Sequence, residues 1–174
     1  SYDFTNKRLD VTVANDFEMD RQIENGDAEG TNATEFYNSG YDVGIVTDPK
    51  DSSNKVWNVP SAASKVWTYI SQNTVYAPGT SYKVTADVYI LGTSTNKEAS
   101  GQLCCNARYK DGDKVDHVVN QTVVEAGKWT TVSFTFNVSA NSTDRSADQF
   151  CFYTNPVGNE GVAYMLDNIK VEKA

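Results

Sequence analysis

The chain closes on Val162-Ala163-Tyr164-Met165-Leu166-Asp167-Asn168-Ile169-Lys170-Val171, which is typical of a β-strand because it is short, apolar and rich in β-branched and aromatic residues. Side chains alternate between the two faces of a strand. Strict alternation places Asp167 in one row with Ala163, Met165, Ile169 and Val171. A buried carboxylate must be hydrogen-bonded, paired or bound to a metal. Two interpretations follow: Asp167 holds a Ca²⁺ ion, or it lies at a β-bulge and accepts backbone N–H bonds.

The rest of the chain consists of similar short segments, about ten in all, spaced by roughly 10–15 residues. They are predicted at 9–13, 41–47, 55–59, 65–75, 82–91, 102–109, 115–124, 129–138, 149–155 and 162–171. Residues 82–91 and 129–138 alternate most cleanly, and no segment has the length and periodicity of a core helix. The pattern predicts an all-β fold, a β-sandwich or jelly roll. The length of 174 residues favours a single domain over residues 1–174.

The net charge of −8 and the single histidine exclude several classes of partner. Nucleic acid requires clusters of Lys and Arg, and anionic membrane surfaces attract basic segments. No apolar run approaches the ~20 residues of a spanning helix. We expect neither a nucleic-acid nor a membrane partner. The chain starts at Ser1 without a signal peptide and ends on Ala174, which suits a module cut from a longer protein.

Three cysteines lack the spacing of a zinc site. Cys104 and Cys105 are adjacent in a predicted strand, so they point to opposite faces, and Cys105 suits the core. Cys104 and Cys151 both fall on outward faces. They are either two free thiols or a cross-strand disulfide.

Five elements in order resemble the carbohydrate-binding modules of families four, nine, sixteen and twenty-two. They are Asn15-Asp16-Phe17-Glu18, Lys55-Val56-Trp57-Asn58-Val59 followed by Trp67, Pro78-Gly79-Thr80-Ser81-Tyr82, Gly127-Lys128-Trp129-Thr130, and the closing stretch from Tyr164 to Val171. They cover nearly the whole chain. Residues 20–51 depart from the pattern of the group, which carries a Trp and a Gly soon after the Phe-Glu pair.

The resemblance implies a jelly roll of two antiparallel sheets. It also implies a non-catalytic, secreted module, usually attached to a polysaccharide-degrading enzyme. The group commonly holds one structural Ca²⁺ between the start of the chain and the last strand. Glu18 and Asp167 match those two positions, and oxygen ligands of this kind are what Ca²⁺ prefers.

Outward side chains on three predicted strands form a candidate binding face. Sugar rings stack on Trp and Tyr, and sugar hydroxyls bond to amides and to the arginine fork. The resemblance points to Trp67 as the stacking residue. The predicted site comprises Trp67, Tyr69, Gln102, Asn106, Arg108, Tyr109, Tyr153 and Asn155. Tyr109 has the parity of a core residue, but it closes its predicted strand and could emerge at the rim.

No acidic pair lies on this face, and no catalytic triad, phosphate loop or dinucleotide motif is present, so we expect no enzyme. The leading hypothesis is a monomeric module that binds internal segments of soluble β-linked plant polysaccharides. Xylan, β-glucan, xyloglucan and glucomannan are the candidates. The alternative is an extracellular structural or adhesion module on the same fold that contacts a protein partner.

Overall fold

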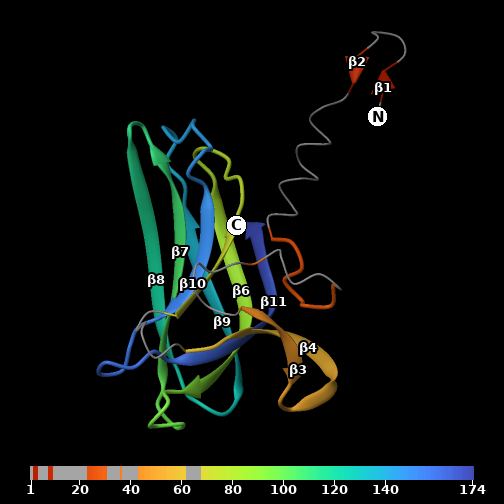
Figure 1. The fold of residues 1–174 in the computed structure, drawn as a ribbon. Coiled ribbons are helices and arrows are strands. Elements are labelled where there is room, and N and C mark those ends of the chain that lie inside the picture. Colours follow the sequence, from red (N-terminus) through yellow and green to blue (C-terminus); the bar gives the residue numbers. More distant parts are fainter. Residues whose placement is uncertain (1, 4–7, 10–22, 31–35, 37–42, 62–67) are drawn as a thin grey trace.

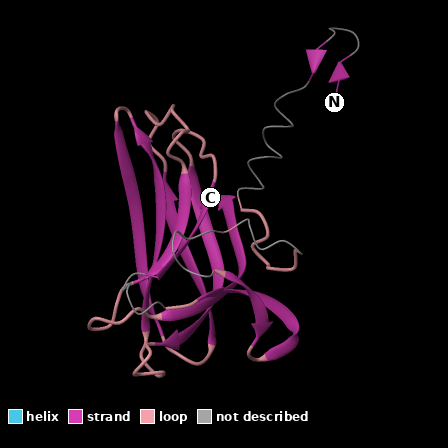
Figure 2. Cartoon of the chain, viewed as in Figure 1, coloured by secondary structure: helices cyan, strands magenta, loops and turns pink. Residues whose placement is uncertain are grey.

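The computed structural model describes residues 2–3, 8–9, 23–30, 36, 43–61 and 68–174, and everything below concerns these residues. The strands are β1 (Tyr2–Asp3), β2 (Arg8–Leu9), β3 (Gly44–Asp48), β4 (Asp51–Val59), β5 (Thr68–Asn73), β6 (Ser81–Gly92), β7 (Gly101–Asp111), β8 (Lys114–Val124), β9 (Trp129–Asn137), β10 (Gln149–Thr154) and β11 (Ala163–Lys173). The described part of the chain contains no helix, so none that could cross a membrane (Figure 2).

Two antiparallel sheets pack face to face and confirm the predicted β-sandwich (Figure 1). One sheet has four strands in the order β5-β10-β7-β8, and the other has five in the order β3-β4-β11-β6-β9. The short strands β1 and β2 pair only with each other. Because neighbours in each large sheet are often far apart in sequence, the fold brings β5 beside β10 and β4 beside β11.

The core between the sheets comes from the alternating pattern of each strand. On β9, Val132, Phe134 and Phe136 are buried while Thr131, Ser133 and Thr135 are exposed. On β10, Phe150 and Phe152 are fully buried, and their rings meet edge to face at 5.0 Å. Burying each aromatic side chain contributes about 2 kcal/mol of hydrophobic free energy, so these inward rows hold the sheets together.

Trp57 and Trp129 both serve packing. Trp57 is fully buried, stacks edge to face on Phe36 at 5.0 Å, and donates from Nε1 to the Asn25 carbonyl oxygen at 2.7 Å. Trp129 is half-buried and donates from Nε1 to Asp48 Oδ1 at 2.9 Å. Through these ring nitrogens, Trp57 ties the segment around Asn25 to the five-stranded sheet, and Trp129 links its two edge strands, β9 and β3.

A β-bulge in β11 corrects the predicted row of the last strand. The pairing with β6 shifts register between Asp167 and Lys170, and Asn168 has a φ of 49°. Tyr164 and Leu166 therefore point into the core before the bulge, and Ile169 and Val171 after it. Gly26 packs on the bulge so closely that a Cβ there would lie 2.1 Å from the Ile169 carbonyl oxygen. Asp167 thus does not share an apolar row with Ile169, because the bulge switches the faces.

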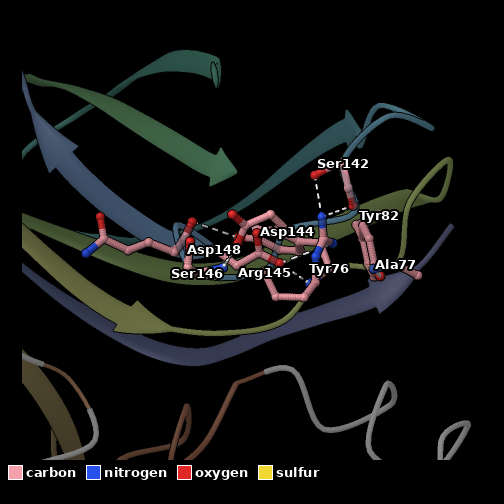
Figure 3. Close-up of polar contacts among 9 residues, drawn as sticks. Tyr76, Ala77, Tyr82, Ser142, Asp144, Arg145, Ser146 and Asp148 are labelled. Carbon is pink, nitrogen blue, oxygen red and sulfur yellow. Dashed lines mark hydrogen bonds and ion pairs between the residues drawn. The ribbon is translucent and has the colours of Figure 1, made fainter. Parts of the chain in front are cut away.

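The Arg145–Asp148 ion pair lies within the loop between β9 and β10, and a backbone hydrogen bond to Asp148 ties this loop to the segment that follows β5 (Figure 3). The Asp148 side chain has no exposed surface. Its Oδ2 lies 3.2 Å from Arg145 Nη1 and accepts the Tyr76 N–H at 2.8 Å. Burial raises the pKa of Asp148, while the Tyr76 N–H and Arg145 oppose that rise. The hydroxyl of Tyr82 accepts the next backbone N–H, that of Ala77, at 2.8 Å.

Candidate functional site

The four-stranded sheet presents one surface away from the core, which we call the outer face. On β7, Leu103, Cys105, Ala107 and Tyr109 point inward, which leaves Gln102, Cys104, Asn106 and Arg108 on the outer face. On β10 the same alternation leaves Gln149, Cys151 and Tyr153 there, and on β5 it leaves Tyr69, Ser71 and Asn73.

Register aligns these residues in rows across the sheet. One row crosses all four strands. It consists of Tyr69 on β5, Tyr153 on β10, Cys104 on β7 and Gln121 on β8, each directly opposite the next. We call these four residues the tyrosine row. Directly opposite side chains on one face start about 5 Å apart. Two half-buried tyrosines therefore lie side by side on the outer face, on the edge strand β5 and its neighbour β10.

Beside the tyrosine row lies an amide pair at the end of β10. Asn155 donates its backbone N–H to the Gln102 carbonyl oxygen at 3.0 Å, and its side-chain Nδ2 donates to Gln102 Oε1. Both side chains are partly exposed. The pair therefore offers oriented amide groups next to the aromatic rings.

On the other side of the tyrosine row come two further rows. One contains Ser71, Cys151 and Asn106, and the next contains Asn73, Gln149 and Arg108. His117 is the β8 register partner of Arg108, and its side chain is not among those described. The outer face thus changes from aromatic to amide and cationic along the strands.

The hydroxyl of Tyr153 is hydrogen-bonded to the buried Cys104 thiol beneath the outer face. Burial, followed by its hydrogen bond to Cys104, raises the pKa of Tyr153 to about 12. The Cys104 thiol is only 1% exposed, and it also lies 3.7 Å from Gln121 Oε1 and 3.8 Å from Asn155 Oδ1. The phenol ring is therefore neutral at physiological pH and anchored at its hydroxyl end.

Most of the predicted site residues lie together on this face. Tyr69, Asn106, Arg108 and Tyr153 belong to the rows described above, and Gln102 and Asn155 form the amide pair beside the tyrosine row. Trp67 lies outside the described residues. The prediction that Tyr109 emerges at the rim is wrong, because β7 continues to Asp111 and the Tyr109 side chain is 3% exposed in the core, where its hydroxyl donates to the Asn137 carbonyl oxygen at 3.2 Å.

Gln121 is a member of the tyrosine row that the strand parity alone did not single out. Its position follows from the hairpin between β7 and β8, whose turn has Gly112 at a φ of 60° and pairs Asp111 with Lys114. A left-handed turn residue of this kind suits glycine. Counting back from the turn would have placed Gln121 opposite Cys104.

Asp167, the predicted metal ligand, lies on the other sheet. Its Oδ1 accepts the Asn168 N–H at 2.8 Å, and its Oδ2 accepts Asn54 Nδ2 at 2.9 Å. Burial raises the pKa of Asp167, and the nearby carboxylates of Asp87 and Glu29 add to the rise. Among the described side chains, no three of His, Cys, Asp or Glu gather into a metal cluster. Glu18 lies outside the described residues.

All three cysteines are free thiols. Cys151 lies opposite Asn106 while Cys104 lies opposite Tyr153, so the two outward cysteines are diagonal neighbours on adjacent strands. Diagonal side chains start about 7–8 Å apart, which separates the two thiols in this arrangement. The structure therefore agrees with the free-thiol alternative.

Several solved structures with the same fold are carbohydrate-binding modules. "Family 16 Carbohydrate Binding Module-2" superposes with a TM-score of 0.60 at 21% identity, covering 87% of this chain and 99% of that one. A "Xylan-Binding Domain from CBM 22" has a TM-score of 0.62 at 12% identity, covering 89% and 97%. A Clostridium thermocellum xylanase fragment, CBM22-1 joined to a GH10 module and complexed with xylohexaose, has a TM-score of 0.65 at 13% identity, covering 88% and 29%.

A search of curated proteins gives no match. A family model described as "Carbohydrate binding domain" matches residues 20–156, and this match spans most of the sandwich, including β5, β7, β8 and β10. A binding module of this kind has no catalytic role, in agreement with the absence of an enzyme motif. By this match the chain belongs to the carbohydrate-binding domain family.

Proposed function

We propose that the outer face binds internal segments of soluble β-linked plant cell-wall polysaccharides. The observation that carries this proposal is the alignment of Tyr69 and Tyr153 in one row, next to the amides of Asn155 and Gln102. The C–H face of a pyranose stacks on a phenol ring, and amides bond to its hydroxyls in either direction. Rings flanked by amides along an open sheet suit a chain that extends beyond the site at both ends.

Xylan, β-glucan, xyloglucan and glucomannan all have backbones of β-linked pyranose rings with mostly equatorial substituents, which leave the apolar ring faces that this surface would contact. The similarity to a module described as xylan-binding and to one complexed with xylohexaose supports xylan as the first ligand to test. We expect an affinity between millimolar and micromolar, about −4 to −8 kcal/mol, because desolvation of the hydroxyls offsets most of the hydrogen-bond free energy.

In its parent protein the module would be extracellular, would act as a monomer, and would raise the local substrate concentration of a covalently attached enzyme. The xylanase fragment, in which such a module is joined to a catalytic one, supports this arrangement. A structural Ca²⁺ between Glu18 and Asp167 completes the proposal. What supports the ion is a buried carboxylate with like charges nearby, because a divalent cation would offset their mutual repulsion.

Affinity gel electrophoresis against a panel of soluble polysaccharides tests the binding proposal. The module should migrate more slowly in gels that contain at least one of the four β-linked candidates than in gels without polysaccharide. Unchanged migration on every member of the panel would contradict the proposal and favour a module that contacts a protein partner.

A further inference from the structure

The outer face has a charge pattern unlike that of the chain as a whole. The protein contains 23 acidic and 15 basic residues. Yet the outward positions along Gln102–Arg108 and their register partners on β5, β8 and β10 include no Asp or Glu. On the five-stranded sheet, in contrast, outward positions hold both signs, such as Asp87 and Lys83.

Among the side chains that the structure describes on this surface without carboxylates, Arg108 carries the charge. It is the exposed member of the β7 outer row, level with Gln149 and Asn73. It forms no ion pair with any described residue. Two carboxylates at this end of the sandwich have other partners, since Asp148 pairs with Arg145 at 3.2 Å and Asp144 pairs with Lys110 at 2.7 Å.

An exposed arginine on a surface without carboxylates suits a site that holds an anionic group as well as neutral sugar rings. Carboxylates accept hydrogen bonds from sugar hydroxyls strongly, because an ionised acceptor makes a shorter and stronger bond. A face without them lacks that means of holding hydroxyls and does not repel an anion. An unpaired guanidinium instead presents a planar fork that matches the two oxygens of a carboxylate or a sulfate.

The spacing along the strands suits a substituent on the same bound chain. Arg108 pairs with Gln149, and Tyr153 lies four residues further along β10. At about 3.3 Å per residue this separates the arginine from the tyrosine row by about 13 Å. A sugar stacked on the tyrosines and an anionic group borne elsewhere on the chain can therefore be held together.

We propose that the outer face prefers polysaccharides that carry an anionic substituent, and that Arg108 binds this substituent. This inference rests on the proposed function. The carboxylate of a uronic acid and a sulfate ester have the chemistry required. The ligand class is thus narrowed from β-linked polysaccharides in general to acidic members of that group.

Matched polysaccharides that differ only in charge test this inference by affinity gel electrophoresis. One pair is native glucuronoxylan and the same material after reduction of its carboxyl groups. A second pair is mixed-linkage β-glucan and its C6-oxidised form, and a sulfated β-glucan forms a third arm. The carboxylated or the sulfated member should bind about three- to tenfold more tightly than its neutral counterpart. The arm with the larger difference identifies the anionic group.

Variants assign the preference to Arg108. Arg108→Gln should bring the ratio of charged to neutral binding close to one, and Arg108→Lys should keep part of it, because Lys retains the charge without the fork. Lys83→Gln, which removes an exposed cation from the opposite sheet, should leave the ratio unchanged. Equal binding of charged and neutral members, or a preference that Arg108→Gln does not reduce, would overturn this inference alone. Failure to bind any member of the series would overturn the proposed function as well.

Discussion

Tyr69 and Tyr153 are direct cross-strand partners on β5 and β10, on the side of the four-stranded sheet that faces away from the core. The two residues are 84 positions apart in the sequence, and the β5–β10 pairing alone brings them together. Both residues are half-buried, so part of each remains accessible to a ligand. This geometry concentrates the aromatic surface of the outer face in one place.

The ring of Tyr153, rather than its hydroxyl, should contribute most of the binding free energy. We expect Tyr153→Ala to weaken polysaccharide binding about tenfold, because it removes the stacking surface, and Tyr153→Phe to keep most of the affinity. Titration calorimetry with the polysaccharide that retards the protein measures both. Met165→Ala, a partly buried change on the opposite sheet, is the control. A Tyr153→Phe variant as weak as Tyr153→Ala would assign the role to the hydroxyl instead.

The thiols should be unreactive in the folded protein. Cys104 and Cys105 are each 1% exposed, and burial raises the pKa of Cys151 to about 11. Because the thiolate is the reactive form, Ellman's reagent at neutral pH should label no cysteine rapidly. All three should react after unfolding in guanidinium, without a reductant, since all are free. Rapid labelling of the native protein, or only one thiol after unfolding, would contradict this arrangement.

The Arg145–Asp148 pair should matter far more for stability than the nearby Lys110–Asp144 pair. Asp148→Ala leaves the buried Tyr76 N–H without its acceptor and the Arg145 guanidinium without its counter-ion, with only Ser142 oxygens among the described residues to accept from it. The substitution should lower the free energy of unfolding by about 3 kcal/mol. Asp144→Ala breaks an exposed pair and should change the urea midpoint little. Equal effects of the two substitutions in urea unfolding would show that burial does not govern the Asp148 contribution.

The calcium proposal predicts a reversible change in thermal stability. Removing Ca²⁺ with EDTA should lower the melting temperature by about 5–10 °C, and adding excess Ca²⁺ should restore it. Asp167→Asn should make the melt insensitive to EDTA, whereas Asp51→Asn, on an exposed residue, should not. Scanning calorimetry provides the comparison. A wild-type melting temperature that EDTA leaves unchanged would exclude a stabilising ion.

Alternation along single strands was enough to predict the architecture. Val132, Phe134 and Phe136 face the core as the pattern requires, and the predicted segments at 82–91 and 129–138 coincide with β6 and β9 within a residue or two. The last strand departs from alternation because Asp167–Lys170 bulges against β6. A bulge depends on the partner strand and on Gly26 packing against it, which no pattern within one strand reveals.

Parity also found most of the outer face, because an outward residue remains outward whichever strand pairs with it. Parity also places Tyr109 in the core, and the prediction that it emerges at the rim failed because β7 continues to Asp111. Parity missed the contribution of Gln121, which depends on the register of the β7–β8 hairpin. The order of the rows across β5, β10 and β7 required the fold itself, since these three strands are not consecutive in the sequence.

The most direct measurement of the central claim is a set of NMR amide shifts recorded while the polysaccharide fragment that binds best is titrated into the protein. If the outer face is the site, the largest shifts will fall on Tyr69, Gln102, Asn106 and Tyr153, and residues of β6 and β9 such as Lys83 and Ser133 will be unaffected. Largest shifts on β6, β9 or β11, with the tyrosine row unchanged, would contradict the assignment of the outer face as the carbohydrate-binding surface.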